Sequence, residues 1–427
     1  MPLTAPEIVH HAALDARLVR VARGLRLLHH ASWPAAVQAR FLSDWRRGQP
    51  RLPRHDYPRH DFSESRRELA AISAAADPAH PLGIYLRESA HSWDTTAQLL
   101  ESLGTAAVTT HSIALYGEPD APLPGNGPST CEAARHFITI ADELDPALLA
   151  PEEQIDISAT SLQLQLQGDL DAFFGERLVE VVLDPELIAK AAAGASRIRL
   201  RSGAAYSDYD RHQLLHHEAL VHSLTAINGR AQPVLASMGL SSPRATATQE
   251  GLAVLAEQIT GSIDIERMKR VSLRIEAVAM ALDGADFLQV FEWFLAAGQS
   301  PEESFSSAQR IFRGVPTDGG HAFTKDTVYL RGLISVHTFF RWALRERRLP
   351  LCRHLFAGKM TLGDALRLEP LYADGVMAAP RWLPRWVRRA NGLAGALAFS
   401  LFANRIRLDA ISDVFQAASL PVDDPRG

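Results

Sequence analysis

Two histidines and two glutamates have the types and spacing expected of a metal-dependent hydrolase. His217 and Glu218 open the hexapeptide HEALVH, which ends at His222, and Glu250 follows 28 residues after His222. Two imidazoles and one carboxylate are the protein ligands of many catalytic zinc sites, in which water takes the fourth position. A glutamate beside the first histidine could take a proton from that water. These residues predict a zinc site with His217, His222 and Glu250 as ligands and Glu218 as general base.

The separation of five residues between His217 and His222 does not suit a regular helix. Side chains four residues apart lie about 40° apart around a helix axis, whereas side chains five apart lie about 140° apart. We expect a helix from residue 208 or 210 to about residue 227, ended by the Asn-Gly pair at 228–229. This helix must contain a π-bulge or loosen near His222 if both rings are to face one ion.

Other interpretations of these residues stay open at this stage. His212 and His216 are four residues apart, which is better helical spacing for a chelate. The hexapeptide could also be a chance pattern that holds two core or surface histidines. Glu257, seven residues after Glu250, could replace it as ligand or could orient a ligating histidine.

Glu250 is expected near the start of its own helix. Thr246 or Thr248 could cap a helix that runs to about residue 259, which places Glu250 in the first turn. From there its carboxylate could cross to the histidine helix. A glutamate in this position is also favoured by the helix dipole alone, without any metal.

Several segments, taken in order, resemble one known family. They are residues 199–204 (RLRSGA), 217–222 (HEALVH), 224–229 (LTAING), 249–253 (QEGLA), 312–314 (FRG) and 323–330 (FTKDTVYL). They are similar to the bacterial proteins named for a QEGLA motif and for supposed modulation of flavohemoglobin expression, and to their eukaryotic relatives, the microtubule-associated tyrosine carboxypeptidases. The resemblance covers roughly residues 40–385. It implies a zinc carboxypeptidase with His217, His222 and Glu250 as ligands and Glu218 as catalytic base.

A second group of chemically useful residues lies at 310–331. A carboxypeptidase must bind a free C-terminal carboxylate, for which Lys325 or Arg313 could supply the cation. It must also stabilise an oxyanion, for which Tyr329 or His321 could supply the donor. On a helix starting near residue 324, Lys325 and Tyr329 are four apart and share a face. Solvated charges and a helix cap would explain the same residues without any site.

Asn228 is a further candidate for substrate binding. Its amide could bond the substrate backbone, or it could serve only to end the histidine helix.

Composition is that of an ordinary globular protein. The 427 residues are 47% hydrophobic and 22% charged, with a formal net charge of −5. The charge gives no reason to expect nucleic acid as a partner. The longest apolar run, residues 392–403, is too short to span a membrane. The two cysteines form no disulfide framework or metal motif, and no signal peptide is visible, so we expect a cytoplasmic enzyme.

Hydrophobic periodicity predicts a predominantly helical α+β fold. Helices are expected at residues 8–28, 64–75, 95–103, 131–150 and through most of 208–344, with breaks at 241–243 and 315–320. Strands are expected at 162–166, 178–183 and 198–200, and a short helix at 185–193. Loops are expected at 49–61 and 117–128.

These elements suggest a small sheet just before the histidine helix, inside a zinc metallopeptidase-like core. The expected organisation is an N-terminal helical region (1–128), the core (129–385) and a C-terminal helical tail (386–427). The function predicted is removal of a C-terminal residue from a peptide or protein by one zinc per chain. Hydrolysis of another amide, such as an isopeptide or γ-glutamyl bond, and a non-catalytic zinc-containing regulator are the alternatives. The sequence does not indicate an oligomeric state.

Overall fold

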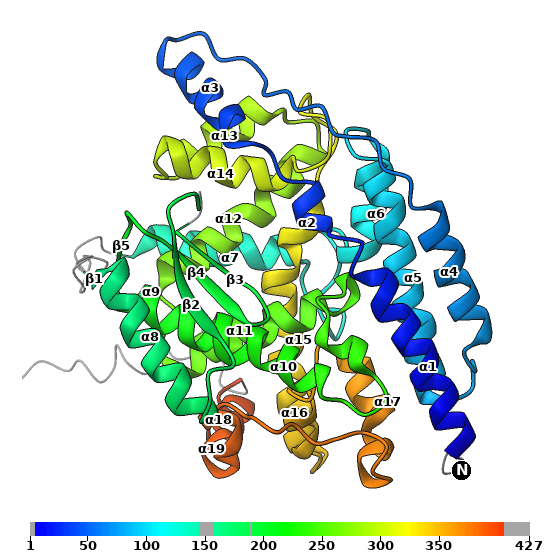
Figure 1. Ribbon diagram of the computed structural model, residues 1–427. Coiled ribbons are helices and arrows are strands. Elements are labelled where there is room, and N and C mark those ends of the chain that lie inside the picture. Colours follow the sequence, from blue (N-terminus) through cyan, green and yellow to red (C-terminus); the bar gives the residue numbers. More distant parts are fainter. Residues whose placement is uncertain (1–4, 145–156, 188–189, 405–427) are drawn as a thin grey trace, which may run out of the picture.

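The protein is mostly helical, with small sheets in the middle of the chain (Figure 1). The computed structural model describes residues 5–144, 157–187 and 190–404. The α-helices are α1 (Ala5–Ala22), α2 (Leu27–His30), α3 (Ala35–Arg46), α4 (Ser63–Ala75), α5 (Pro81–Glu101), α6 (Ala107–Tyr116), α7 (Thr130–Glu143), α8 (Ala159–Phe174), α9 (Asp208–Gln213), α10 (Leu224–Arg230), α11 (Thr246–Thr260), α12 (Ile265–Leu282), α13 (Phe287–Ala296), α14 (Pro301–Ile311), α15 (Val328–Arg345), α16 (Pro350–His354), α17 (Leu362–Ala373), α18 (Arg385–Arg388) and α19 (Ala390–Ala403). A π-helix, η1 (Leu214–Ser223), and the 3-10 helices η2 (Ala236–Gly239), η3 (Pro243–Ala245) and η4 (Thr324–Thr327) lie between them.

The strands form two small sheets. β1 (Ile157–Ser158) pairs antiparallel with β5 (Ala205–Tyr206). In the other sheet, β4 (Arg197–Arg201) lies between β2 (Glu180–Asp184), to which it is parallel, and β3 (Ala191–Ala193), to which it is antiparallel. The sheet packs against η1, and α8 packs against β2 (Figure 1). Thus β3 is an edge strand beside the histidine helix.

Most of the expected elements are confirmed. The expected helices at 8–28, 64–75 and 95–103 correspond to α1 with α2, to α4 and to part of α5, which pack beside one another (Figure 1). The predominantly helical α+β class, the strands at 178–183 and 198–200, and the loops at 49–61 and 117–128 are confirmed as well. The helix expected at 131–150 is α7 as far as Glu143, and residues 145–150 lie outside the described residues. The three-part domain division stays a prediction, and residues 405–427 of its last part lie outside the described residues.

Two expectations about the middle of the chain are wrong. Residues 162–166, which alternate Leu and Gln, belong to helix α8. Leu162, Leu166 and Leu170 are buried at a spacing of four, while Leu164 is 70% exposed. The run therefore uses its helical periodicity. The helix expected at 185–193 is also absent, because Ala191–Ala193 is strand β3; residues 188–189 lie outside the described part.

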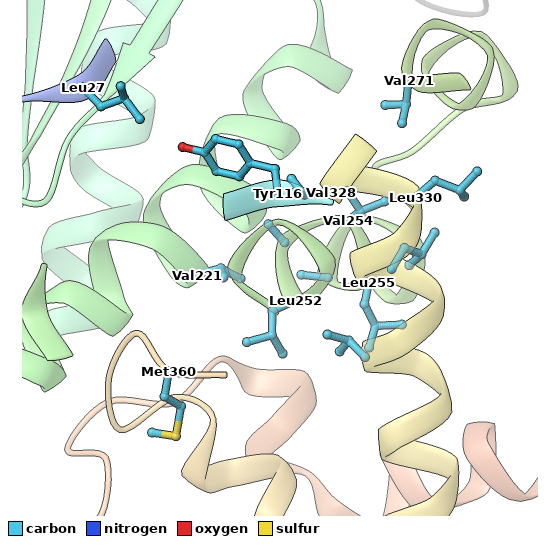
Figure 2. Packing of buried hydrophobic residues seen from close by; sticks show 14 of the residues in the cluster. Leu27, Tyr116, Val221, Leu252, Val254, Leu255, Val271, Val328, Leu330 and Met360 are labelled. Carbon is cyan, nitrogen blue, oxygen red and sulfur yellow. The ribbon is translucent and has the colours of Figure 1, made fainter. Parts of the chain in front are cut away.

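The core is densest where α11 crosses α15. Leu252 and Leu255 of α11 and Leu330 of α15 are buried here, with Val221 of η1 beside them (Figure 2). The two backbones touch at a pair of glycines. A Cβ atom on Gly251 would lie 2.2 Å from the carbonyl oxygen of Gly332, so neither helix tolerates a side chain at the crossing. This crossing holds α11, which carries Glu250, directly against α15.

The apolar run 392–403 forms α19. Leu393 and Leu397 are buried, whereas Phe399 and Phe402 are 74% and 64% exposed. Across the described residues, every helix is too short or too polar to traverse a bilayer.

Candidate metal centre

The irregular turn required by the histidine spacing is present. Residues 214–223 form the π-helix η1 between α9 and α10. In a π-helix the hydrogen bonds run between residues five apart, so side chains five apart come close to one face. His217 and His222 accordingly point to the same place, with their Nε2 atoms 3.2 Å apart.

A carboxylate oxygen completes the cluster. Glu250 Oε2 lies 3.6 Å from His217 Nε2 and 3.5 Å from His222 Nε2. Ligands placed 2.0–2.2 Å from a tetrahedral metal are about 3.3–3.6 Å from one another, so the three atoms match three corners of such a site. Among the described residues, these three form the group of His, Cys, Asp or Glu side chains that could hold a metal ion. The donor set and its dimensions thus fit a divalent metal.

His212 and His216 do not form the alternative chelate. Their rings stack at 6.1 Å, and His212 Nδ1 bonds Asp208 at 3.1 Å. His216 lines a different cavity, on the other side of η1. A separation of four residues favours His212 and His216 as metal ligands only on a regular α-helix. His216 lies in η1, which is a π-helix.

Glu257 orients His217 from behind. Its side chain is fully buried, and its Oε1 lies 2.5 Å from His217 Nδ1 and 2.7 Å from Arg267 Nη2. If Nδ1 carries the proton shared with Glu257, the Nε2 lone pair faces the cluster, as a metal requires. Burial acts against a charged ring, yet hydrogen bonds with Glu250 and Glu257 raise the pKa of His217 to about 10. The two carboxylates therefore favour a positive charge at His217, which either a proton or a metal ion would supply.

The contact between Glu257 and His217 predicts the effect of Glu257→Gln. An amide in place of this carboxylate weakens the hydrogen bond that fixes the ring, and metal affinity should fall by about 10–100-fold. Competition with a chromophoric chelator measures the change. Glu266→Gln, an exposed substitution on nearby α12, is the control and should leave the affinity unchanged. Equal affinities in the Glu257 variant and the wild type would contradict the orienting role.

α11 places Glu250 opposite the histidines. Thr225 of α10 donates a hydrogen bond to Gln249 Oε1 at 2.8 Å, which ties the two helices together one residue before the ligand. The expected threonine cap is wrong: Thr246 begins the helix, and its N-cap, Ala245, offers no side-chain bond. Glu250 thus lies in the second turn of α11, and its position depends on the helix crossing and on the Thr225 bond.

Lys325 and Tyr329 share a face, as expected, and both approach Glu250. Lys325 Nζ lies 3.2 Å from Glu250 Oε1 and 5.2 Å from the centre of the Tyr329 ring. Burial opposes its charge, but Tyr329 and Glu250 raise the pKa of Lys325 above its ordinary value. One oxygen of Glu250 thus faces the histidines while the other faces a permanent cation.

The cluster opens into a cavity of about 700 Å³. Glu218 lines this cavity, with Oε1 3.9 Å from His217 Nε2. The end of β3 (Ala192 and Ala193) and the next two residues, 194–195, form part of the wall. The cationic side chains Arg26, Arg310, Arg313, Lys325 and Lys359 line it as well. The site is therefore a strongly basic cavity beside an unpaired strand edge.

Two of the cavity's arginines differ in their partners. Arg310 forms a two-point ion pair with Asp326, at 2.8 and 2.5 Å. Arg313 forms no ion pair among the described residues, and its buried Nε has no hydrogen-bond partner. Burial first, and then the charge of Arg310, lower the pKa of Arg313. Arg313 is thus a cavity cation that has no ion-pair partner in the part of the chain that the structure describes.

The structure does not bring His321 or Asn228 to the cluster. Neither residue lines this cavity. Asn228 is 2% exposed, and its amide nitrogen donates to the carbonyl oxygens of Phe356 and Trp382. Its amide is therefore used inside the fold and does not face the cavity. The helix ends close to the expected stop at 228–229, since α10 runs to Arg230.

Lys359 is a cavity residue that the motifs did not reveal. It donates to Ser241 Oγ at 2.8 Å and has no carboxylate partner among the described residues, unlike Lys190, Lys269 and Lys325. Burial, opposed by Glu250 and Glu218, lowers its pKa to about 8. The one available signal was its retention as lysine in a chain with four lysines among 44 basic residues.

Fold and site together define a class: a mostly helical protein whose basic cavity holds a two-histidine, one-glutamate cluster able to bind a metal. The chain belongs to the microtubule-associated tyrosine carboxypeptidase family, whose model matches residues 39–405. This membership confirms the relation to the eukaryotic carboxypeptidases and implies a carboxypeptidase-type hydrolase acting on a peptide or protein. A search of curated proteins gives no match to the chain.

Proposed function

We propose that the protein is a zinc-dependent carboxypeptidase that removes the last residue of a peptide or protein. The observation that carries the proposal is the convergence of His217 Nε2, His222 Nε2 and Glu250 Oε2 at 3.2–3.6 Å, beside Glu218. Nitrogen and carboxylate ligands of this kind favour zinc, although manganese or cobalt would fit the same set. The QEGLA segment at 249–253 supports placing the chain with the bacterial QEGLA-motif proteins.

The residues of the cavity divide the chemistry among them. When bound, zinc supplies the Lewis acidity that makes water a nucleophile near neutral pH. Glu218 takes a proton from the attacking water and returns it to the leaving amine when the carbon–nitrogen bond breaks. Tyr329, which lines the cavity, would donate to the oxyanion that forms at the scissile carbonyl.

Strand β3 could position the backbone of the substrate. An extended peptide can add to an exposed strand edge through main-chain hydrogen bonds. β3 is such an edge, and residues 192–195 line the cavity that contains the cluster. A peptide paired with β3 would run past Glu218 and the metal ligands.

Arg313 is the residue we assign to the terminal carboxylate. Of the two cations expected from the sequence, Lys325 already pairs with Glu250, whereas Arg313 has no carboxylate partner among the described residues. An arginine–carboxylate pair is strong because both groups are charged and their geometry allows two hydrogen bonds. Lys325 then serves to hold Glu250 in place.

This assignment predicts a selective defect for Arg313→Met. We expect KM for a peptide with a free C-terminus to rise about 10–100-fold, since one charged hydrogen-bonded contact of about 1.5–3 kcal/mol is lost. Steady-state kinetics measure it, with Arg345→Met, an exposed residue 68% accessible at its side chain, as the control. A C-terminally amidated peptide should be a poor substrate of both proteins, and good cleavage of it by the wild type would argue against carboxylate recognition.

The activity itself is tested with a peptide library varied at the last residue and read by mass spectrometry. Loss of one C-terminal residue with metal present is the expected result. Cleavage only of isopeptide or γ-glutamyl bonds would favour another amidase. Bound zinc without cleavage of any substrate would favour a regulator, although a structural site is normally closed by four protein ligands.

A further inference from the structure

A second cavity lies directly behind the catalytic residues. It has a volume of about 340 Å³ and is lined largely by polar side chains. His217, Glu218, Arg310 and Tyr329 line both this cavity and the larger one. The two spaces are therefore neighbours at the residues that would carry out the hydrolysis.

Strand β3 lines both cavities. Ala191, at one end of the strand, lines the second cavity, whereas residues 192–195 line the first. A peptide paired with this edge would have its body in the first cavity and its last residue near or in the second. A carboxypeptidase needs this arrangement, because the residue beyond the scissile bond is the one released.

The second cavity is cationic. Four basic side chains line it, against the carboxylates of Asp210 and Glu218. Three of the four have carboxylate partners: Lys190 with Asp210 at 2.6 Å, Arg267 with Glu257 at 2.7 Å, and Arg310 with Asp326 at 2.8 Å. The fourth is Arg274 of α12.

Arg274 has no such partner among the described residues. Its Nε is buried and without a hydrogen bond, and none of the residues that the structure describes forms an ion pair with it. Burial, and then the neighbouring charge of Arg310, lower its pKa to about 10. The charge of Asp326 favours the guanidinium, but Asp326 forms its ion pair with Arg310. A guanidinium with a buried, unbonded Nε and no ion pair of its own is costly to a folded protein. A carboxylate brought by a ligand would supply the missing partner.

We infer that the second cavity receives the released residue and selects an acidic side chain, glutamate or aspartate, through Arg274. The inference rests on the proposed carboxypeptidase activity and adds its side-chain preference. Arg313 then binds the terminal carboxylate and Arg274 the side-chain carboxylate. Arg310 lines both cavities, and its charge acts on both arginines.

Peptides of one sequence that end in Glu, Gln or Tyr test the inference. Glu and Gln have the same shape and differ in charge, so kcat/KM for the Glu peptide should exceed that for the Gln peptide at least tenfold. In Arg274→Gln this preference should disappear through loss of activity on the Glu peptide, with the Gln peptide little affected. Arg270→Gln is the matched control, because Arg270 is exposed on the same helix and does not line the cavity.

Folding of the variant is checked separately. Arg274→Gln removes a charge that forms no ion pair with any described residue, so its melting temperature should equal or exceed that of the wild type. A second readout needs no turnover: calorimetry with free glutamate and free glutamine on the metal-loaded protein. Glutamate should bind more tightly than glutamine to the wild type, and no better than glutamine to Arg274→Gln.

The outcomes separate the inference from the proposed function. Equal cleavage of the Glu and Gln peptides by the wild type would overturn the acidic preference and leave the carboxypeptidase proposal standing. An equal loss on all three peptides in Arg274→Gln would also overturn it, because Arg274 would then bind the terminal carboxylate or act structurally. Selective glutamate binding without any cleavage would support the cavity's preference while contradicting the peptidase activity.

Discussion

Glu218→Gln should abolish turnover while leaving the metal bound. The amide keeps the size of the side chain but cannot accept the proton of the attacking water, and general-base catalysis is worth about 10²–10⁴-fold in rate. Since Glu218 would also return the proton to the leaving amine, we expect kcat to fall by about 10³-fold or more with KM little changed. Single-turnover assays on a peptide of the preferred ending measure the loss, and metal analysis measures the zinc content.

The control for this substitution is Glu292→Gln, an exposed glutamate on α13. It changes the net charge equally and should have full activity. A Glu218→Gln protein that keeps its metal and at least a tenth of wild-type kcat would exclude Glu218 as the base and turn attention to Tyr329.

Removal of the metal should eliminate activity and lower stability together. Without the metal, His217 alone lies between Glu250 and Glu257, whose other partners are Lys325 and Arg267. A ligand present at about 1,000 times its dissociation constant stabilises a protein by about 4 kcal/mol. Dialysis against a chelator should therefore lower the melting temperature by several degrees, and one equivalent of zinc should restore both properties.

Two histidine variants test whether the loss of metal, activity and stability depends on the cluster itself. His222→Gln should bind no zinc and resemble the stripped protein. His212→Gln changes a histidine on the preceding helix, outside the cluster, and should retain zinc and activity. Full activity after complete metal removal, or zinc retained by His222→Gln at wild-type affinity, would overturn the metal-centre proposal.

The candidate site could be predicted from the sequence to the extent that its geometry is local. The five-residue separation of His217 and His222 demands an irregular helix, and η1 is a π-helix at that position. The spacing of Lys325 and Tyr329 likewise requires only one turn of helix. The position of Glu250 depends less on local structure, since it lies on another helix, α11. Only its sequence motif indicates that it belongs to the site.

Other parts of the site depend on the tertiary fold and gave no signal. Arg274 is one arginine on an 18-residue helix, and only the packing of α12 brings it near Arg310. The Asn-Gly pair at 228–229 predicts a helix end, because Asn-Gly is common there. In the structure, the side-chain amide of Asn228 also donates to the carbonyl oxygens of Phe356 and Trp382, which are far away in the sequence. The leucines at 162–166 recur every second residue, as in a strand, and every fourth residue, as in a helix. In the structure every fourth leucine is buried, so the segment forms helix α8.

The contact between Gly251 and Gly332 has a consequence for catalysis. α11 carries the glutamate of the cluster, and α15, with η4 before it, carries Tyr329 and Lys325. The distance between the two helices is at the minimum that backbone atoms allow, so it cannot drift shorter and lengthens if either glycine gains a side chain. The glycine of the QEGLA segment thus sets how far Glu250, the proposed zinc ligand, lies from Tyr329, the proposed donor to the oxyanion.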